Sequence, residues 1–385
     1  MALTDVYCTP SGAGAHDGTS EADAYSWTEW KSNYASDYTS STNGTHNWFK
    51  GTGFTESSDV TIDFTEDNTK HFIMEGYGTT TGDNTRAEFT MTSARIYLSF
   101  NVDGVCQIRN FKLTGTRNSS QLLYMAGDNS VMVNCWGENT ATTSGGGALL
   151  MAKGTMVDCY GKSATTSTTA ADWVGAITVN GGAAIRCVGE ATGGGHAVYI
   201  NAVNQGTAMI HCVGIGDNTT SSQAAFYVSR LDQIDSFVMA HCTGVEAAYG
   251  VYSSNSPDIN APAGFDSCLF YDISAYGFYD ATGTPNDAGW FVSNCAMGSV
   301  TSGRSNLSEW HEFNPITLSA DPFTDLSGYD LSLNDTVGGG ALAKGVLPFG
   351  GWKQTDMAGT EYQNVGALGN NPSGGGGTAS APTWW

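Results

Sequence analysis

Eight of the nine cysteines recur along the chain at nearly constant spacing. Successive members lie 29, 24, 28, 25, 30, 26 and 27 residues apart. These cysteines are Cys106, Cys135, Cys159, Cys187, Cys212, Cys242, Cys268 and Cys295. Five of them stand in the phrase apolar-x-Cys-x-Gly, for example Val133-Asn134-Cys135-Trp136-Gly137. The alternation predicts a short strand whose cysteine faces inward, repeated once in every structural unit.

A second set of short apolar segments lies between successive cysteines and recurs with nearly the same period. Its members are Ala148–Met151, Ala176–Val179, Ala197–Ile200, Ala225–Val228, Tyr249–Tyr252 and Tyr276–Tyr279. Short strands joined by turns of varying length can keep a constant register if each strand pairs with its equivalent in the next repeat. The sequence therefore predicts an all-β fold, a single-stranded right-handed parallel β-helix with about 27 residues per coil.

In this fold the inward cysteines form a column of small, apolar core side chains. Stacked side chains run parallel to one another, whereas disulfides need converging Cβ atoms and metal sites need ligands that converge on one point. We therefore expect neither disulfides nor a bound metal. No cofactor is expected either.

Composition and charge narrow the classes of partner. The chain has 50 glycines and only 14% charged residues, so few helices are expected. Its formal net charge of −22 repels a polyanionic backbone, which argues against nucleic acid as a ligand. No apolar run is long enough to insert in a membrane, and the first ten residues lack the charged and apolar regions of a secretory signal. Synthesis in a cytoplasm is expected.

The repeat predicts four regions. Residues 1–50 form an N-terminal cap, in which Trp27 and Trp30 lie on one face of a short helix and cover the first coil. Residues 51–304 form the coils, and residues 305–369 form a closing segment. Residues 370–385 are a glycine-rich tail ending in Trp384 and Trp385, which we expect to anchor the protein to a neighbour. In the alternative, the tail folds back on its own closing segment.

The closing segment and the opening carry a resemblance. The phrases Ala320-Asp321-Pro322-Phe323 and Tyr329-Asp330-Leu331-Ser332-Leu333, with Gly338–Leu342 and Asn364–Leu368, resemble the end of many right-handed β-helix proteins of phages and environmental bacteria. The segment from Tyr7 to Trp27 resembles their first coil. The resemblance implies a structural protein on the surface of a tailed bacteriophage virion, either a capsid decoration or head fibre, or a tail spike or fibre. It implies other virion proteins as partners and a homo-oligomer, a trimer in many phage spikes.

The candidates for catalytic residues are polar side chains that are expected to face outward. The residues before the repeating cysteines form the column Asn134, Asp158, Arg186, His211, His241, Ser267 and Asn294. In it His211 and His241 lie on neighbouring coils and could bind a metal or assist proton transfer, although a solvated stripe is the simpler interpretation. The other candidates are the acidic pairs Asp232 with Asp235 and Asp266 with Asp272, each near a turn. The motifs typical of pectin-cleaving β-helix hydrolases are not intact here, and Gly195-His196-Ala197 comes nearest to one of them.

Exposed turns and aromatic residues suggest a second kind of site. The expected turns are residues 138–147, 161–173 and 214–223. Trp136, Tyr160 and Trp173 would stack on sugar rings if they face outward, and in the other interpretation they fill gaps between turns. These features favour a virion protein that displays its turns to a host-surface glycan.

Two other functions stay open. One is a polysaccharide lyase or glycoside hydrolase on a β-helix scaffold, that is, a polysaccharide depolymerase. The other is a purely architectural cement protein. The sequence favours a non-enzymatic role.

Overall fold

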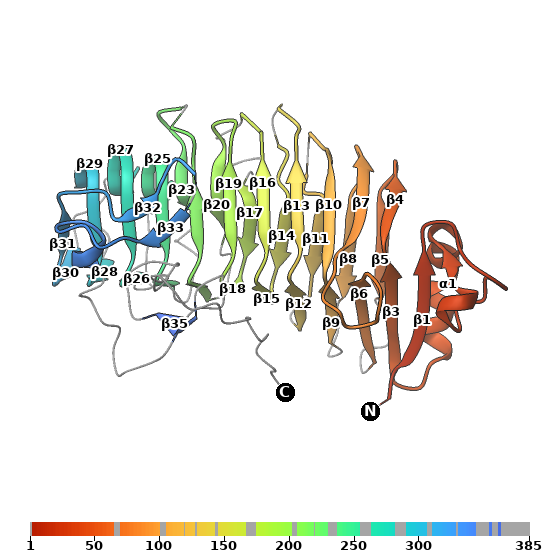
Figure 1. Cartoon of the computed structure of the whole chain (residues 1–385). Coiled ribbons are helices and arrows are strands. Elements are labelled where there is room, and N and C mark those ends of the chain that lie inside the picture. Colours follow the sequence, from red (N-terminus) through yellow and green to blue (C-terminus); the bar gives the residue numbers. More distant parts are fainter. Residues whose placement is uncertain are drawn as a thin grey trace. The chain divides into compact units, whose positions relative to one another are not determined.

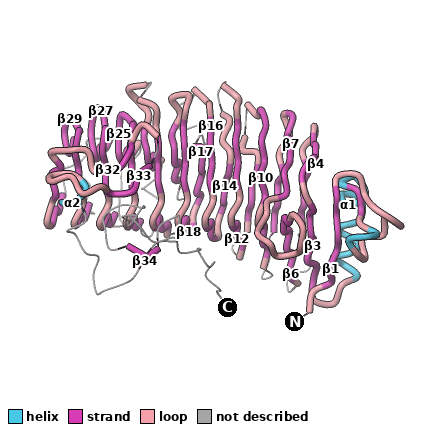
Figure 2. The backbone as a smooth tube through the Cα atoms, in the orientation of Figure 1, coloured by secondary structure: helices cyan, strands magenta, loops and turns pink. Residues whose placement is uncertain are grey.

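The computed structural model describes residues 2–64, 70–100, 105–118, 120–127, 129–142, 145–166, 175–201, 206–218, 220–229, 237–254, 263–281, 290–305, 310–328 and 330–343, with two short strands at 354–355 and 361–362. The chain divides into two compact units. Unit 1 comprises residues 1–183 and 190–195, and unit 2 comprises residues 184–189 and 196–385. Strands dominate both units (Figure 2).

Unit 1 contains strands of two parallel sheets, which we name sheet A and sheet B. The strands of sheet A are β1 Thr4–Thr9, β2 Tyr25–Ser26, β3 Gly44–Lys50, β6 His71–Tyr77, β9 Cys106–Arg109, β12 Ser130–Val133 and β15 Thr155–Val157. The strands of sheet B are β4 Thr52–Glu56, β5 Val60–Phe64, β7 Ala87–Thr92, β8 Ile96–Phe100, β10 Phe111–Thr116, β11 Leu123–Ala126, β13 Trp136–Asn139, β14 Leu149–Ala152, β16 Tyr160–Ser163 and β17 Gly175–Asn180. Strands β18 Gly182–Ile185 and β19 Val188–Ala191 hold residues of both units.

Unit 2 repeats the same arrangement. Its strands in sheet A are β21 Thr207–Ile210, β24 Phe237–Ala240, β26 Ala263–Asp266, β28 Trp290–Ser293 and β30 Trp310–Phe313. Its strands in sheet B are β20 His196–Ile200, β22 Val213–Ile215, β23 Ala224–Val228, β25 Thr243–Ser253, β27 Leu269–Asp280, β29 Ala296–Ser305 and β31 Ile316–Leu318. Two short antiparallel pairs follow, β32 Phe323–Asp325 with β33 Asp330–Leu333 and β34 Gln354–Thr355 with β35 Glu361–Tyr362.

Within each unit, the strands of sheets A and B pair in parallel with their equivalents in the next coil (Figure 1). In unit 1, Tyr124 of β11 pairs with Tyr97 of β8 on one side and with Leu150 of β14 on the other. In unit 2, Tyr227 of β23 lies between Tyr199 and Tyr252 in the same way. The chain makes about eight turns of roughly 26 residues. The predicted parallel β-helix is confirmed.

A helix covers the first coil of unit 1. The helix α1 spans Trp27–Ser40, follows the short 3₁₀ helix Glu21–Asp23, and begins with a capping box formed by Ser26 and Glu29. Trp27 and Trp30 are buried and stack on each other at 5.3 Å. The indole of Trp30 donates to Asn47 Oδ1 at 3.0 Å, which ties the helix to β3. The predicted aromatic helix is confirmed, although residues 1–50 also contain β1 and β3, which belong to the sheet A ladder.

The residues before the repeating cysteines form the corners between sheet A and sheet B. Each adopts a left-handed backbone, with φ between 50° and 56°, in Asn134, Asp158, Arg186, His211, His241, Ser267 and Asn294. Asn110 and Asn314 have the same backbone at the equivalent corners, although Phe111 and Pro315 follow them in place of cysteine. Asn tolerates this conformation better than most residues do, which explains its frequency in the column. The cysteine thus follows a bend between two strands. The alternation had predicted that it lies within one strand, and this prediction is wrong.

Seven of the predicted cysteines, from Cys135 to Cys295, occupy this corner position and are buried. The Sγ atom of Cys242 lies 3.4 Å from Ala240 O and 3.5 Å from Met209 O of the preceding coil, and the others are held in a similar way. Burial raises the pKa of Cys268 and Cys295 well above the usual value. All nine cysteines remain as thiols.

Cys106 is the exception in the predicted ladder. It lies in β9, where its register partners are Phe72 and Ser130. The residue after the corner in that coil is Phe111, which follows Asn110. The 29-residue gap before Cys135 fits the period, but the register places Cys106 in another column.

The glycine of the repeated phrase faces the interior, where the two arms of sheet B approach each other. A Cβ atom on Gly161 would lie 2.4 Å from Ala176 O, and one on Gly214 would lie 2.4 Å from Ala225 O. Real Cβ atoms do not come so close to a carbonyl oxygen. The Cys-x-Gly phrase and the apolar segment that begins with Ala are therefore one packing unit within each coil.

The closing region of unit 2 begins after β31, which still pairs with β29. The strands β32 and β33 and the short helix α2, Gly340–Ala343, follow. Phe323 is buried and contacts the ring of Tyr271 edge-on at 6.1 Å. The predicted tail at 370–385, with Trp384 and Trp385, lies outside the described residues. Among the described helices, none is long and apolar enough to cross a membrane.

Candidate functional site

Polar and aromatic side chains gather on the outer face of sheet A in unit 1. Alternation along β3 buries Asn47 and Phe49 and turns His46, Trp48 and Lys50 outward. The parallel register then places Glu75 of β6 beside Trp48, and Arg109 of β9 beside Glu75. We call His46, Trp48, Glu75 and Arg109 the sheet A cluster.

Glu75 is the centre of the sheet A cluster. Its carboxylate is only 8% exposed, and its Oε2 lies 3.0 Å from His46 Nε2 and 3.8 Å from Arg109 Nη1. The Nδ2 atom of Asn110 donates to the other oxygen, Oε1, at 3.4 Å. A buried carboxylate needs such partners, because an unpaired buried charge is costly. Glu75 is therefore held in place from three sides.

Aromatic rings fix the orientation of the histidine. The ring of His46 stacks on Trp48 at 3.8 Å with an interplanar angle of 26°. The indole N–H of Trp48 donates to Asp5 Oδ1 at 2.9 Å, and the ring of Tyr77 meets Trp48 edge-on at 6.0 Å. Burial and the nearby Glu21 carboxylate raise the pKa of Tyr77 well above its usual value, so this phenol stays protonated. Stacking on Trp48 therefore holds one face of the His46 imidazole in place.

This arrangement suits proton abstraction from a substrate that carries a carboxylate. When His46 donates its Nε2 proton to Glu75, the Nδ1 atom is left as an acceptor and can act as a general base. Arg109 is 39% exposed and presents a guanidinium, which matches the geometry of a carboxylate. Within the described ranges, no three His, Cys, Asp or Glu side chains are grouped closely enough to hold a metal ion.

The predicted sugar-stacking residues Trp136 and Tyr160 lie together on the outer face of sheet B in unit 1. Their rings are 4.0 Å apart, and the guanidinium of Arg86 lies 5.8 Å from the Trp136 ring. The Tyr160 hydroxyl contacts Glu190, which also pairs with Lys162 at 2.8 Å. Tyr160 and Arg86 thus both pack against the Trp136 ring. Trp173 lies outside the described residues.

The structure separates the members of the predicted acidic pair in unit 2. Asp266 ends β26, where Ser293 and Asn294 donate to its Oδ1. Asp272 lies in the middle of β27 with φ of 55°, and Asn218 Nδ2 lies 3.5 Å from its Oδ2. The two carboxylates therefore have different hydrogen-bond partners. Asp232 and Asp235 lie outside the described residues.

The predicted neighbours His211 and His241 are confirmed. Their rings stack at 5.0 Å, nearly parallel, and both side chains are buried at the corners of unit 2. Burial, the neighbouring His241 and Arg186 lower the pKa of His211 to about 3. Burial also lowers the pKa of His241, although the Asp266 carboxylate opposes this shift. Both rings are neutral near pH 7, and parallel rings do not converge on a common metal.

Sequence reasoning missed the sheet A cluster because His46, Trp48 and Glu75 precede the cysteine repeat. The alternating phrases His46-x-Trp48-x-Lys50 and Ile73-x-Glu75-x-Tyr77 do indicate outward polar faces. Only the register shows that the two phrases lie side by side, with Arg109 next to them.

Comparisons with known proteins find a solved structure with a similar fold but identify no family. No family model matches the sequence, and no curated protein matches it. Among solved structures, the chain is similar to the crystal structure of the pectate lyase Pel9A, with a TM-score of 0.62 and 14% sequence identity. The similarity covers 96% of this chain and 98% of that chain. At this identity the similarity shows a shared β-helix fold.

Proposed function

We propose that the protein is a polysaccharide lyase that cleaves a uronic acid polymer at the sheet A cluster of unit 1. The observation that carries the proposal is the contact of His46 with the buried Glu75 carboxylate, beside the exposed Arg109. A hydrolase needs two carboxyl groups flanking one bond, whereas elimination needs a base and a cation. The cluster supplies the second set.

In this mechanism Arg109 binds the C6 carboxylate of a uronate residue. The Nδ1 atom of His46 takes the proton from C5, and the electron pair forms the C4=C5 double bond while the C4–O4 bond breaks. Water gives a proton to the departing oxygen. The charge that develops on the carboxylate in the transition state is stabilised by the guanidinium, and Glu75 stabilises the imidazolium that forms.

The pectate lyase with the same fold supports the choice of reaction. Because fold alone does not determine function, the proposal depends on the residues of the cluster. It selects one of the alternatives left open by the sequence and replaces the non-enzymatic role as our leading hypothesis. Attachment to a virion surface, binding of a host glycan and a homotrimeric state stay predictions from the resemblance of the caps.

The direct test is to incubate the purified protein with polygalacturonate and other polyuronates and to follow the ultraviolet absorbance of the unsaturated product. The variant H46N should reduce kcat about 10²- to 10⁴-fold, the usual effect of losing a general base. The matched control is H16N, because His16 also pairs with a glutamate, Glu29, at 2.8 Å, but far more exposed and outside the cluster. It should keep full activity.

The proposal fails if the wild-type protein releases no unsaturated product from any polyuronate. It also fails if H46N and H16N cleave equally fast. Release of saturated ends would indicate a hydrolase, and another site would then have to be sought.

A further inference from the structure

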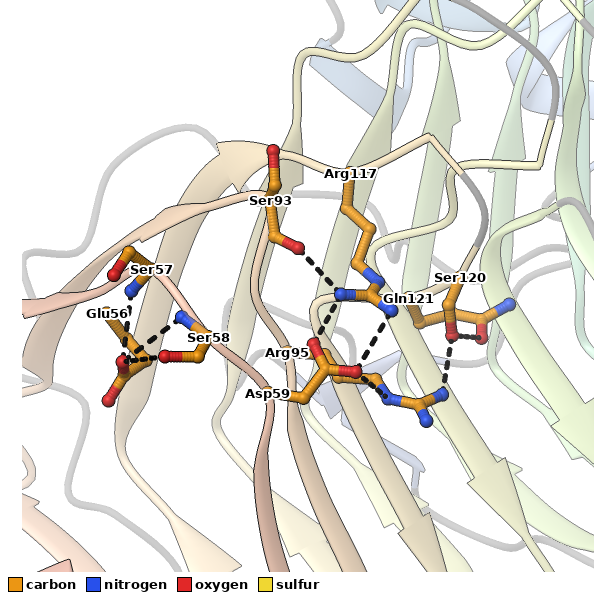
Figure 3. A network of polar contacts seen from close by, with 9 residues as sticks. All are labelled: Glu56, Ser57, Ser58, Asp59, Ser93, Arg95, Arg117, Ser120 and Gln121. Carbon is orange, nitrogen blue, oxygen red and sulfur yellow. Dashed lines mark hydrogen bonds and ion pairs between the residues drawn. The ribbon is translucent and has the colours of Figure 1, made fainter.

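A second charged cluster of unit 1 lies at the outer turns of sheet B, on three successive coils (Figure 3). Asp59 precedes β5, Arg95 precedes β8 and Arg117 follows β10. Arg117 contacts both carboxylate oxygens of Asp59, with Nη2 3.2 Å from Oδ2, and Arg95 Nε lies 3.2 Å from the same Oδ2. In the turn before Asp59, the backbone N–H groups of Ser57 and Ser58 donate to Glu56.

Two guanidinium groups share the Asp59 carboxylate, and Lys31 balances the charge of Glu56, so the cluster keeps one positive charge. Arg117 is used within the protein, because its Nη1 also donates to Ser93 O at 2.7 Å and its side chain is only 14% exposed. Arg95 is 29% exposed, and its Nη1 donates to Ser120 Oγ at 3.1 Å. Its other terminal nitrogen, Nη2, has no partner among the described residues. The excess charge therefore belongs to Arg95.

One phenol ring lies against this guanidinium, and a second ring packs against the first. Arg95 lies 5.2 Å from the centroid of Tyr97, and the Tyr97 ring lies 4.6 Å from that of Tyr124. Both tyrosines face outward and are partly exposed, because the residues on either side of them in β8 and β11 are buried. Burial and the neighbouring Tyr97 raise the pKa of Tyr124 despite the nearby Arg95 cation. The Tyr124 phenol therefore stays neutral and adds no negative charge.

We infer that Arg95, Tyr97 and Tyr124 form a binding site for a uronate residue, separate from the sheet A cluster. The sugar carboxylate would accept hydrogen bonds from Arg95 and balance the excess charge, while the C–H groups of the ring pack on the phenols. The Asp59–Arg117 pair alone can hold the coils together, so this structural role does not account for a second guanidinium stacked on a partly exposed ring. The identity of the polymer rests on the proposed function.

Binding can be measured without cleavage by affinity electrophoresis in gels containing polygalacturonate, with every variant made in the H46N protein. R95Q leaves the Asp59–Arg117 pair intact and should weaken binding about tenfold, the effect of losing one charge-assisted hydrogen bond. D59N raises the positive charge of the cluster and should tighten binding. The matched control is R86Q, because Arg86 also stacks on an aromatic ring, Trp136, away from this site.

Fully methyl-esterified polygalacturonate is the neutral probe and should bind more weakly to the parent protein, with no further loss in R95Q. Equal retardation of R95Q and R86Q in the acidic gel overturns the inference, as does tighter binding of the neutral polymer. If both proposals hold, R95Q in the protein with His46 intact should raise KM and keep kcat. A binding loss in R95Q without any lyase activity would leave this site and remove the catalytic proposal.

Discussion

The buried His211 of unit 2 makes a defined contribution to the pH dependence of stability. Its pKa is about 3 in the folded protein against 6.5 in the unfolded chain. Because the folded pKa is the lower one, the unfolded chain binds more protons below pH 6.5. The stability that the neutral ring provides is therefore complete above pH 6.5 and is lost as the pH falls from 6.5 towards 3.

At pH 5 this difference amounts to about 1.5 pKa units, or about 2 kcal/mol of unfolding free energy. The side chain is 7% exposed, so solvent screening reduces the value little. The variant H211N removes the titration and should fit the backbone, because Asn294 and Asn134 occupy the same corner with nearly the same φ. Its stability should fall about 2 kcal/mol less than that of the wild type between pH 7.5 and pH 5.

Urea unfolding followed by tryptophan fluorescence at several pH values gives the comparison. The control S267N changes another residue of the corner column that does not titrate, so its stability should be offset equally at every pH. Parallel curves for wild type and H211N between pH 7.5 and pH 5 would refute the argument. They would show that the ring is protonated in the folded protein or is solvated there.

Two further predictions concern the construction of the coils. G214A should lower the unfolding free energy by about 3 kcal/mol, because its Cβ would lie 2.4 Å from Ala225 O. In the control G264A the nearest atom would lie 3.9 Å from the new Cβ, so its unfolding free energy should hardly change. Urea unfolding of both variants distinguishes close packing from chain entropy. N139A should lower the unfolding free energy by about 3 kcal/mol in the same assay, because the buried amide forms hydrogen bonds with the backbone of Arg117, Ala141 and Gly147. A loss below about 1 kcal/mol would show that water replaces the amide.

The candidate site shows where sequence reasoning fails. His46 and Glu75 lie on neighbouring coils, 29 residues apart, yet neither belongs to a repeated phrase that would set their register. Trp136 and Tyr160 lie in register on neighbouring coils, because both follow a repeating cysteine. What the phrase could not show is that Arg86 packs against the ring of Trp136.

The corners explain the errors in alternation. A left-handed residue before each repeating cysteine bends the chain. The inward and outward alternation of side chains along a strand therefore does not continue across the corner. Asp266 and Asp272 are close in sequence, but Ser267 and Asp272 both have φ above 50°, and the two carboxylates end in different sheets. Positive φ outside glycine is uncommon, so these bends are hard to predict from one sequence.

The sequence by itself determined the parallel β-helix, its period, the buried cysteine column and the aromatic helix near its start. These features repeat or are local, so each follows from spacing and side-chain type alone. The tertiary structure decided the position of Cys106, the buried environment of His211, and the meeting of His46, Glu75 and Arg109. These depend on which residues of distant coils share a register, and loop length, which varies from coil to coil, sets that register.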